Sequence, residues 1–226
     1  MTITVSTPAT AADLRRYRTL AYTAGAVTAL CALHADTSPG VVPVGPGGHT
    51  LLPDAVYAAS DRCATPDGPR PQPYGQTVLD RVVTGDGALI AWRVPGGGPD
   101  PDTGPAWTAG IAWIRLGLTT RLLDLAAAHL RGRTVAGVVT LNLPMVRGIL
   151  ADAAAGIAEA RALLDTGAGP YGAELHRVHR ALDESGRSCL HLFGAAGFLT
   201  DGPGGDLRVS ELLAETYPPP TDVEAS

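Results

Sequence analysis

The stretch VRGILADAAAGIAEARALL (residues 146–164) sets the fold class of this chain. Its apolar side chains recur every three or four residues, which predicts an amphipathic helix that buries one face. That face consists of Val146, Leu150, Ala153, Ile157, Ala160 and Leu164, and the opposite face mostly carries Arg147, Asp152, Glu159 and Asp165. Pro144 suits the first turn of such a helix, and Gly167 is a natural stop after it.

The segments on either side of this helix repeat its pattern. The preceding segment, from about Trp107, places five apolar residues on one stripe: Ile111, Ile114, Leu118, Leu122 and Leu125. The following segment, between Pro170 and Gly194, does the same with Leu175, Val178, Leu182, Cys189 and Leu192. Three such helices joined by short links predict an antiparallel bundle over residues 107–193. We expect a fourth, shorter helix over residues 206–216 and little sheet after Pro105.

The residues before the bundle predict a small α/β region. We expect one helix over Thr10–Ala35, turns over residues 39–53, and a short helix from Asp54 through Cys63. The proline-rich residues 67–73 predict an extended linker. Strands over Thr77–Val83 and Ala88–Val94 flank Thr84-Gly-Asp-Gly87, which is a strong hairpin signal.

These segments together predict a mainly α protein, in which an antiparallel helical bundle carries a small N-terminal α/β appendage containing a hairpin. The expected organisation is a reduced N-terminal region over residues 1–105, a bundle domain over residues 106–217, and a disordered tail over residues 218–226.

Composition and charge exclude several classes of function. The formal net charge of −5 gives no indication of a nucleic-acid partner or of an anionic membrane surface. The three cysteines are scattered, with no pair at metal-binding spacing, which favours a reduced cytoplasmic compartment. The sequence has no apolar run of about 18 residues, so we expect no membrane span. The N-terminus also lacks the pattern of a secretory signal.

Two joints of the predicted bundle carry candidate binding residues. Arg133-Thr-Val-Ala-Gly137 puts a guanidinium at a turn, where it could hold a phosphate or carboxylate, or simply cap the preceding helix. Gly194-Ala-Ala-Gly197 follows a helix and would let a dinucleotide or another backbone approach closely, or would form a plain helix cap. His176 and His179 share a helix, but no third metal ligand is placed beside them, so no metal site is predicted.

The order of these motifs resembles the C-terminal helical domain of the acyl-CoA dehydrogenase family. Family members have Arg-x-x-Phe-Gly after a helix, and here Arg133-Thr-Val-Ala-Gly137 matches it, with Ala136 in place of Phe. The next helix in the family carries Leu-Ala-Asp and an Arg nine positions later, which correspond to Leu150-Ala-Asp152 and Arg161. The family's Gly-Gly-x-Gly-aromatic turn is similar to Gly194-Ala-Ala-Gly-Phe198. The resemblance covers residues 107–217, about half of the chain.

The resemblance implies a shared flavin site. It makes Arg133, Gly194 and Gly197 contacts to the nucleotide part of FAD at a subunit interface. The family's Arg-Asp pair falls on Val209-Ser210, and its Tyr-Glu-Gly-Thr falls on Tyr217-Pro218-Pro219-Pro220. The glutamate that removes the substrate's α-proton in the family is therefore absent at this position. In a shifted register, Glu215 or Glu211 would be the catalytic base.

The region before the bundle is too short to hold the family's N-terminal helical domain and its middle β domain. We therefore predict a reduced subunit of a heteromeric flavin-dependent complex, acting on or near an acyl thioester, without self-sufficient dehydrogenase activity. Its partner is either a second copy, in a homodimer, or a full-length acyl-CoA dehydrogenase homologue. Two alternatives remain open: a flavin-free enzyme of cyclase or isomerase type, acting on an acyl or polyketide intermediate, and a non-catalytic scaffold.

Overall fold

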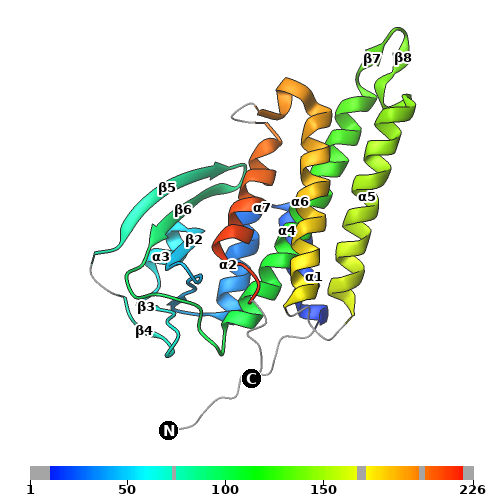
Figure 1. Ribbon diagram of the computed structural model, residues 1–226. Coiled ribbons are helices and arrows are strands. Elements are labelled where there is room, and N and C mark those ends of the chain that lie inside the picture. Colours follow the sequence, from blue (N-terminus) through cyan, green and yellow to red (C-terminus); the bar gives the residue numbers. More distant parts are fainter. Residues whose placement is uncertain (1–10, 73–74, 167–171, 199–201, 221–226) are drawn as a thin grey trace.

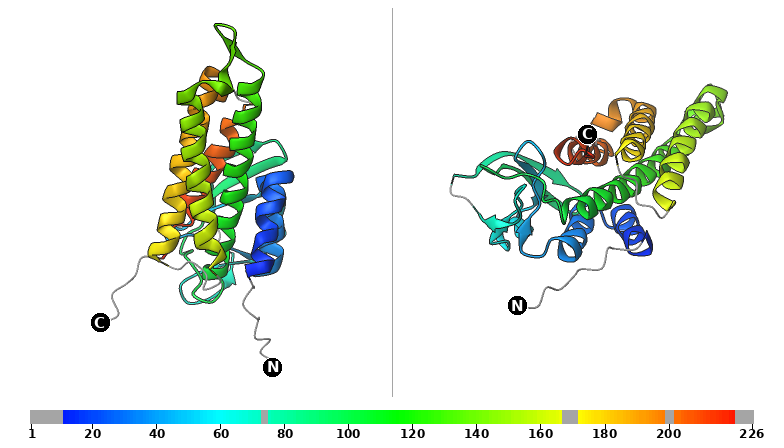
Figure 2. Two further views of the ribbon diagram at one scale, coloured as in Figure 1. Left: turned by 90° about the vertical axis from the view of Figure 1, so that its right-hand side faces the viewer. Right: turned by 60° about the horizontal axis from the view of Figure 1, so that its bottom comes forward.

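A long helix, α4 (Gly104–Arg131), lies at the centre of the molecule, as Figures 1 and 2 show. The computed structural model describes residues 11–72, 75–166, 172–198 and 202–220. Five helices contact α4: α1 (Ala11–Thr23), α2 (Ala26–Thr37), α5 (Pro144–Asp165), α6 (Ala173–Phe193) and α7 (Gly204–Thr216). Every residue from Trp107 to Thr119 is buried. Ile111, Ile114 and Leu118 of the predicted stripe are buried as expected. The predicted amphipathic pattern was wrong for this half of α4, because α1 and α2 cover the other side of the helix as well.

The antiparallel bundle of α4, α5 and α6 is confirmed, and α7 is the predicted fourth helix. On α5, the second half of the predicted face is buried, from Ala153 to Leu164. Val146 and Leu150 are only half-buried, since the first turns of α5 extend beyond the main core. Leu125 of α4 is 43% exposed, so it too was wrongly assigned to the core. Gly167, the expected stop, lies outside the described residues.

The predicted helix over Thr10–Ala35 is two helices, α1 and α2. The chain bends at Gly25, whose φ of +125° lies in the region that favours glycine. Asp86, in the turn of a hairpin far along the chain, accepts a 2.9 Å hydrogen bond from the backbone N–H of Thr28 and so satisfies the start of α2. The break rotates the second helix, so that Ala24 and Thr28 are exposed, although in one continuous helix both would share a face with the buried Tyr17 and Ala21.

The predicted hairpin is confirmed as β5 (Thr77–Thr84) and β6 (Gly87–Arg93). It forms an antiparallel sheet of order β2-β6-β5, in which β2 (His49–Pro53) replaces the turns expected over residues 39–53. A second small sheet joins three two-residue strands, β1 (Val41–Val42), β3 (Arg62–Cys63) and β4 (Arg70–Pro71). The helix expected from Asp54 through Cys63 is shorter, α3 (Asp54–Ala58), because the chain turns into β3.

One apolar core runs through the sheet region and the bundle. It joins Leu33 of α2 and Leu51 of β2 to Trp113 of α4 and Leu213 of α7. The helix-rich architecture with a small sheet is the predicted fold class. The division at residues 105 and 106 stays a prediction, and residues 221–226 of the expected tail lie outside the described residues.

A small hairpin, which the sequence did not predict, joins α4 to α5. Its strands are β7 (Thr134–Val135) and β8 (Val138–Val139), and a 3-10 turn over Thr140–Asn142 leads into α5. The turn uses positive φ at both Ala136 (+49°) and Gly137 (+81°), the backbone of a type I′ turn. The glycine of the Arg133–Gly137 motif is therefore explained by the turn itself. The hairpin projects beyond the end of the bundle (Figure 1).

The close packing of α4 against α1 gives a stability prediction. A Cβ at Gly117 would overlap the carbonyl oxygen of Arg18 and lie 2.8 Å from the Cβ of Ala21. We expect Gly117→Ala to lower the free energy of unfolding by about 1–3 kcal/mol through overpacking. Gly148→Ala is the matched control, because a Cβ there meets nothing within 4 Å, and we expect it to add about 0.5–1 kcal/mol. Equal effects of the two variants in urea unfolding would contradict this packing.

Candidate functional site

Arg133 lies at the exposed end of the bundle, between the last turn of α4 and β7. Its carbonyl oxygen accepts hydrogen bonds from the backbone N–H of Thr140 at 2.8 Å and from the Thr140 hydroxyl at 3.1 Å, which closes the base of the hairpin. Its guanidinium donates to Nε2 of His129 at 3.2 Å. Among the described residues, no carboxylate forms an ion pair with Arg133. The charge of this arginine is therefore available to an anion from outside.

The surroundings of Arg133 contain further positive charge. Arg131 and Arg147 are exposed on the two helices that flank the hairpin, and the sequence has no Asp or Glu from Leu125 to Ala151. Exposed arginines without acidic neighbours attract phosphate and carboxylate groups.

The predicted glycine turn lies at this same end of the bundle (Figure 1). Gly194 ends α6 with a φ of +57°, and a Cβ there would meet nothing within 4 Å. Gly197 is different, because a Cβ there would lie 2.7 Å from Cδ1 of Leu190 and 3.2 Å from Cβ of Phe193. The structure thus leaves open space beside Gly194, whereas Gly197 is needed for packing against α6.

Two aromatic rings connect these motifs. The His129 ring lies 5.1 Å from the Phe193 ring, centre to centre, and Phe193 directly precedes Gly194. Both rings line an open groove of about 740 Å³, which also borders the β5–β6 turn and the start of α7. Arg121 and Asp206 pair with each other at the groove, which neutralises their charges. Arg133 contacts His129, and Gly194 directly follows Phe193. The contact between the His129 and Phe193 rings therefore connects two motifs that are 61 residues apart in the sequence.

This end of the bundle combines several features that bear on the binding of an anion. It offers an arginine without a carboxylate partner, an open glycine turn, and aromatic side chains between them. It offers no acid for proton transfer, because Asp206 is engaged by Arg121.

The candidate bases lie elsewhere, on α7. Glu211 is half-buried and accepts a 2.7 Å hydrogen bond from Nε of Arg187. Glu215 is exposed on the same helix. Neither carboxylate lines the groove or the cavity described next. Their assignment as catalytic residues stays a prediction, and the geometry around them adds nothing to it.

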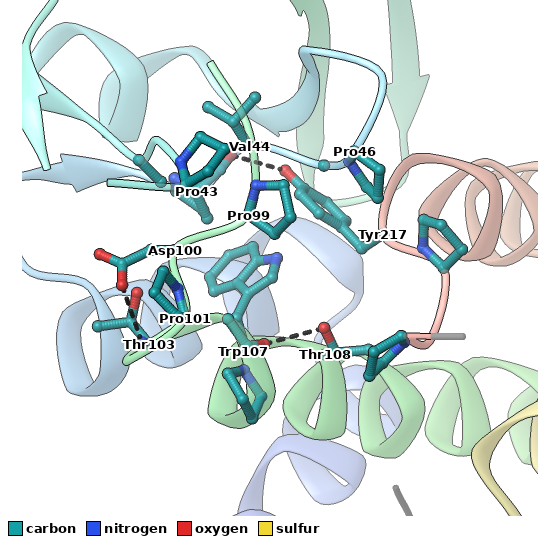
Figure 3. A pocket seen from close by; sticks show the side chains of 17 residues that line it. Pro43, Val44, Pro46, Pro99, Asp100, Pro101, Thr103, Trp107, Thr108 and Tyr217 are labelled. Carbon is teal, nitrogen blue, oxygen red and sulfur yellow. Dashed lines mark hydrogen bonds between the residues drawn. The ribbon is translucent and has the colours of Figure 1, made fainter. Parts of the chain in front are cut away.

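A cavity of about 350 Å³ lies at the other end of α4, where Trp107 and Tyr217 form its floor (Figure 3). Its walls are largely proline rings: Pro43, Pro46, Pro66, Pro99, Pro101, Pro105, Pro218 and Pro220. The cavity has the size and the apolar character of a small-molecule site. Sequence reasoning missed it because its walls come from four segments that are distant in the chain. Their only shared signal is richness in proline.

The polar groups around this cavity are mostly engaged within the protein. The Tyr217 hydroxyl lies 2.9 Å from the Thr50 hydroxyl and accepts a 3.1 Å hydrogen bond from the backbone N–H of Leu51. Burial raises the pKa of Tyr217 far above its ordinary value, so this phenol stays neutral. Asp100 is buried and accepts backbone N–H bonds from Asp102 at 2.8 Å and from Thr103 at 3.4 Å, which fixes the turn before α4.

Sequence reasoning also missed a charged network in the middle of the bundle. Arg115 of α4 is fully buried, and its guanidinium donates to the Ser210 hydroxyl at 3.0 Å, to Nδ1 of His179 at 2.5 Å, and to the carboxylate of Asp183. These partners lie on α6 and α7, so one side chain ties three helices together. The available signal was an arginine within the apolar stretch Ile111–Leu118.

His179 is neutral in this network. Because an arginine can only donate, Nδ1 of His179 must accept, and the proton of the neutral ring lies on Nε2, which has no partner within the described residues. Burial, and next the charge of Arg115, lower the pKa of His179 from 6.5 to about 3. A histidine that already accepts from an arginine cannot also serve as the metal ligand considered from the sequence. Among the described residues, no group of three or more candidate ligands could hold a metal ion.

This pKa shift predicts a pH dependence of stability. Between about pH 6.5 and pH 3, the unfolded chain binds a proton at His179 that the folded chain does not. We expect the free energy of unfolding to fall as the pH drops through this window, by up to about 1.4 kcal/mol per pH unit for this one group. His179→Gln should make the pH dependence shallower in urea unfolding at pH 7, 6 and 5. An unchanged slope would show that His179 is not the group responsible.

Comparison with known proteins gives structural matches only. No protein-family model matches the chain, and no curated protein does. A glutaryl-CoA dehydrogenase from Mycobacterium smegmatis, solved in complex with FADH2, is 15% identical with a TM-score of 0.54, over 74% of this chain and 54% of that chain. Butyryl-CoA dehydrogenase from Megasphaera elsdenii is 14% identical with a TM-score of 0.51, over 85% of this chain and 61% of that chain.

A steroid acyl-CoA dehydrogenase named Tcur3481-Tcur3483 is 17% identical with a TM-score of 0.51, over 77% of this chain and 61% of that chain. The matched part of each of these proteins is therefore less than two thirds of its length. At these identities the matches establish the fold: the bundle has the fold of the helical domain of acyl-CoA dehydrogenases. No described helix is both long enough and apolar enough to cross a membrane.

Proposed function

We propose that this chain is a reduced subunit of a flavin-dependent, acyl-CoA-dehydrogenase-type complex acting on an acyl thioester. A larger homologous chain would supply the β domain that covers the flavin ring, together with the catalytic base. This chain would contribute the end of its bundle, with Arg133 and the turn at Gly194, to the nucleotide half of a shared FAD site. The observation that carries the proposal is the exposed guanidinium of Arg133, which has no carboxylate partner within the described residues.

The geometry of α4 supports a shared site over a site within one chain. From Trp107 to Arg131 the helix spans about 36 Å at the α-helical rise. The cavity beside Tyr217 and Pro218, at the register where the related enzymes have their base, therefore lies at the opposite end of α4 from Arg133. Each end of the bundle would thus serve a different site, and the Arg133 end would serve a site on a neighbouring chain.

In such a complex the bound flavin would supply the electron acceptor for oxidation of the acyl group. Arg133 would donate hydrogen bonds to the phosphate oxygens and offset their charge, held in place by the hairpin base at Thr140. His129 would orient the guanidinium, and the absence of a side chain at Gly194 would let the nucleotide approach the end of α6. No residue of this chain is assigned a proton-transfer role in the complex.

A purification experiment tests this proposal. The tagged chain would be produced together with a full-length acyl-CoA dehydrogenase encoded in the same genome, and the purified material examined for both chains and for flavin absorbance. We expect a stoichiometric yellow complex with the wild type. Arg133→Ala should lower flavin retention, by about 10- to 100-fold in affinity, as the loss of a hydrogen bond to a charged group predicts. Arg180→Ala, which removes an exposed arginine from the middle of α6, is the matched control and should retain the flavin.

The alternative is a flavin-free protein that acts on, or simply binds, an acyl or polyketide intermediate. The apolar cavity beside Tyr217 and Pro218 favours it, because a small molecule could be held there without flavin. Under this alternative the purified chain is a colourless, stable homodimer, and Arg133→Ala changes neither its assembly nor its ligand binding.

A further inference from the structure

The cavity at the start of α4 has one unsatisfied polar group. Trp107 is only 2% exposed, and its indole N–H has no hydrogen-bond acceptor within the described residues. In Figure 3 the indole nitrogen lies on the edge of the ring that faces Tyr217 and Thr108. A buried donor without an acceptor destabilises the folded protein, and an acceptor brought by a ligand removes that cost.

The neighbouring side chains do not accept this N–H in the structure. The Thr108 hydroxyl donates to the carbonyl oxygen of Gly104 at 2.9 Å. The Tyr217 hydroxyl is held by Thr50 and Leu51, on the far side of its ring from α4. The Tyr217 ring itself packs edge to face with Trp107 at 5.4 Å. A ring face is a weak acceptor, so a ligand oxygen would form the stronger bond.

The rest of the cavity disfavours a charged ligand and favours a ligand that is mostly apolar. Proline rings, Val44 and Ala64 supply most of the surface, and the buried Asp100 already accepts two backbone N–H groups. An anion would meet Asp100 and find no cation among the residues that line the cavity. The volume of about 350 Å³ is roughly twice that of the 150 Å³ apolar cavity known to hold benzene, which corresponds to a body of one or two rings.

From these observations we infer that the cavity binds a neutral, largely apolar carbonyl compound. Its oxygen accepts the Trp107 indole N–H after a small shift of the side chains that cover this nitrogen in the unliganded protein. The aromatic floor of Trp107 and Tyr217 and the proline walls hold the apolar body. The inference does not depend on flavin, on Arg133 or on a partner chain, since the cavity is built from one chain alone. It can therefore be tested on the isolated protein, and its failure leaves the proposed function untouched.

A matched pair of probes tests the role of the carbonyl. Acetophenone and ethylbenzene share an aromatic ring and a two-carbon side chain, and only acetophenone carries an acceptor oxygen. We expect acetophenone to bind the wild-type chain about tenfold more tightly than ethylbenzene, the effect of about one hydrogen bond. In proton–nitrogen NMR spectra, the indole N–H signal of Trp107 should move downfield with acetophenone and stay nearly unchanged with ethylbenzene. Trp107→Phe assigns this signal among the three tryptophans.

Two variants separate binding from folding. Trp107→Phe keeps an aromatic floor but removes the donor, and should bind both probes with equal affinity. Pro99→Trp places a large side chain on the exposed rim, outside the core, and should block both probes; Pro71→Trp, on the exposed strand β4, is its matched control and should leave binding intact. The inference is wrong if the wild type binds neither probe, if it binds both equally, or if Trp107→Phe retains the preference for acetophenone.

Discussion

Arg115→Ala is expected to lower the free energy of unfolding by about 3–5 kcal/mol, the cost of breaking a buried ion pair from one side. The substitution would leave the carboxylate of Asp183, the hydroxyl of Ser210 and the ring of His179 without their common donor. It would also leave a cavity where α4, α6 and α7 meet. Urea unfolding at pH 7 measures the effect.

Two controls identify the origin of that loss. Arg187→Ala removes an exposed arginine that pairs with Glu211 on α7, and it should cost less than about 1 kcal/mol. Arg115→Met fills most of the volume without the charge and should lose less stability than Arg115→Ala. A cost below about 1 kcal/mol for Arg115→Ala would contradict a stabilising role of this network at the junction of α4, α6 and α7.

The second large effect concerns turnover. Removing the α-proton of an acyl thioester needs a base within hydrogen-bond reach of that proton. The sequence resemblance aligns Pro218 with the glutamate that is this base in the acyl-CoA dehydrogenase family, and proline cannot accept a proton. We expect the isolated chain, supplied with FAD, to show no reduction of an artificial electron acceptor by acyl-CoA substrates. Activity should appear only with a full-length homologue.

Two variants decide between the outcomes of this assay. In the mixed complex, Arg133→Ala should reduce the activity at limiting FAD by about 10- to 100-fold, through weaker binding of the cofactor. If the isolated chain does turn over and Glu215→Gln abolishes that activity, the base is present on α7 and the reading of this chain as a dependent subunit is wrong.

The bundle was predictable because its outer helices repeat a three- and four-residue apolar spacing. The predictions for α4 and for the first helix were wrong where the buried residues do not form a single stripe along the helix. The first half of α4 is covered on all sides, so no stripe exists there to be recognised. The division between α1 and α2 depends on the backbone of Gly25 and on Asp86, which comes from a turn far along the chain. The apolar pattern of the first 35 residues alone cannot reveal the hydrogen bond between Thr28 and Asp86.

The candidate site was predictable only in part. Arg133 and Gly194 were identified from local motifs. They lie at one end of the bundle because α5 runs antiparallel to both α4 and α6, so the C-terminal ends of α4 and α6 are at the same end. Gly197 carries the same motif but serves packing against Leu190, which only the three-dimensional contacts reveal. Tertiary packing also creates the Trp107 cavity and the Arg115 network. The residues of both features are far apart in the sequence. A single arginine or tryptophan within an apolar stretch does not indicate which residues it will contact.

Sedimentation velocity, followed at the visible absorbance of flavin, tests the central claim most directly. The sample is this chain mixed with a full-length acyl-CoA dehydrogenase homologue and FAD. The account predicts one flavin-bearing boundary that contains both chains, that is lost with Arg133→Ala, and that is retained with Arg180→Ala. If this chain sediments alone and without flavin while the homologue keeps its flavin unaided, the shared-site account is contradicted.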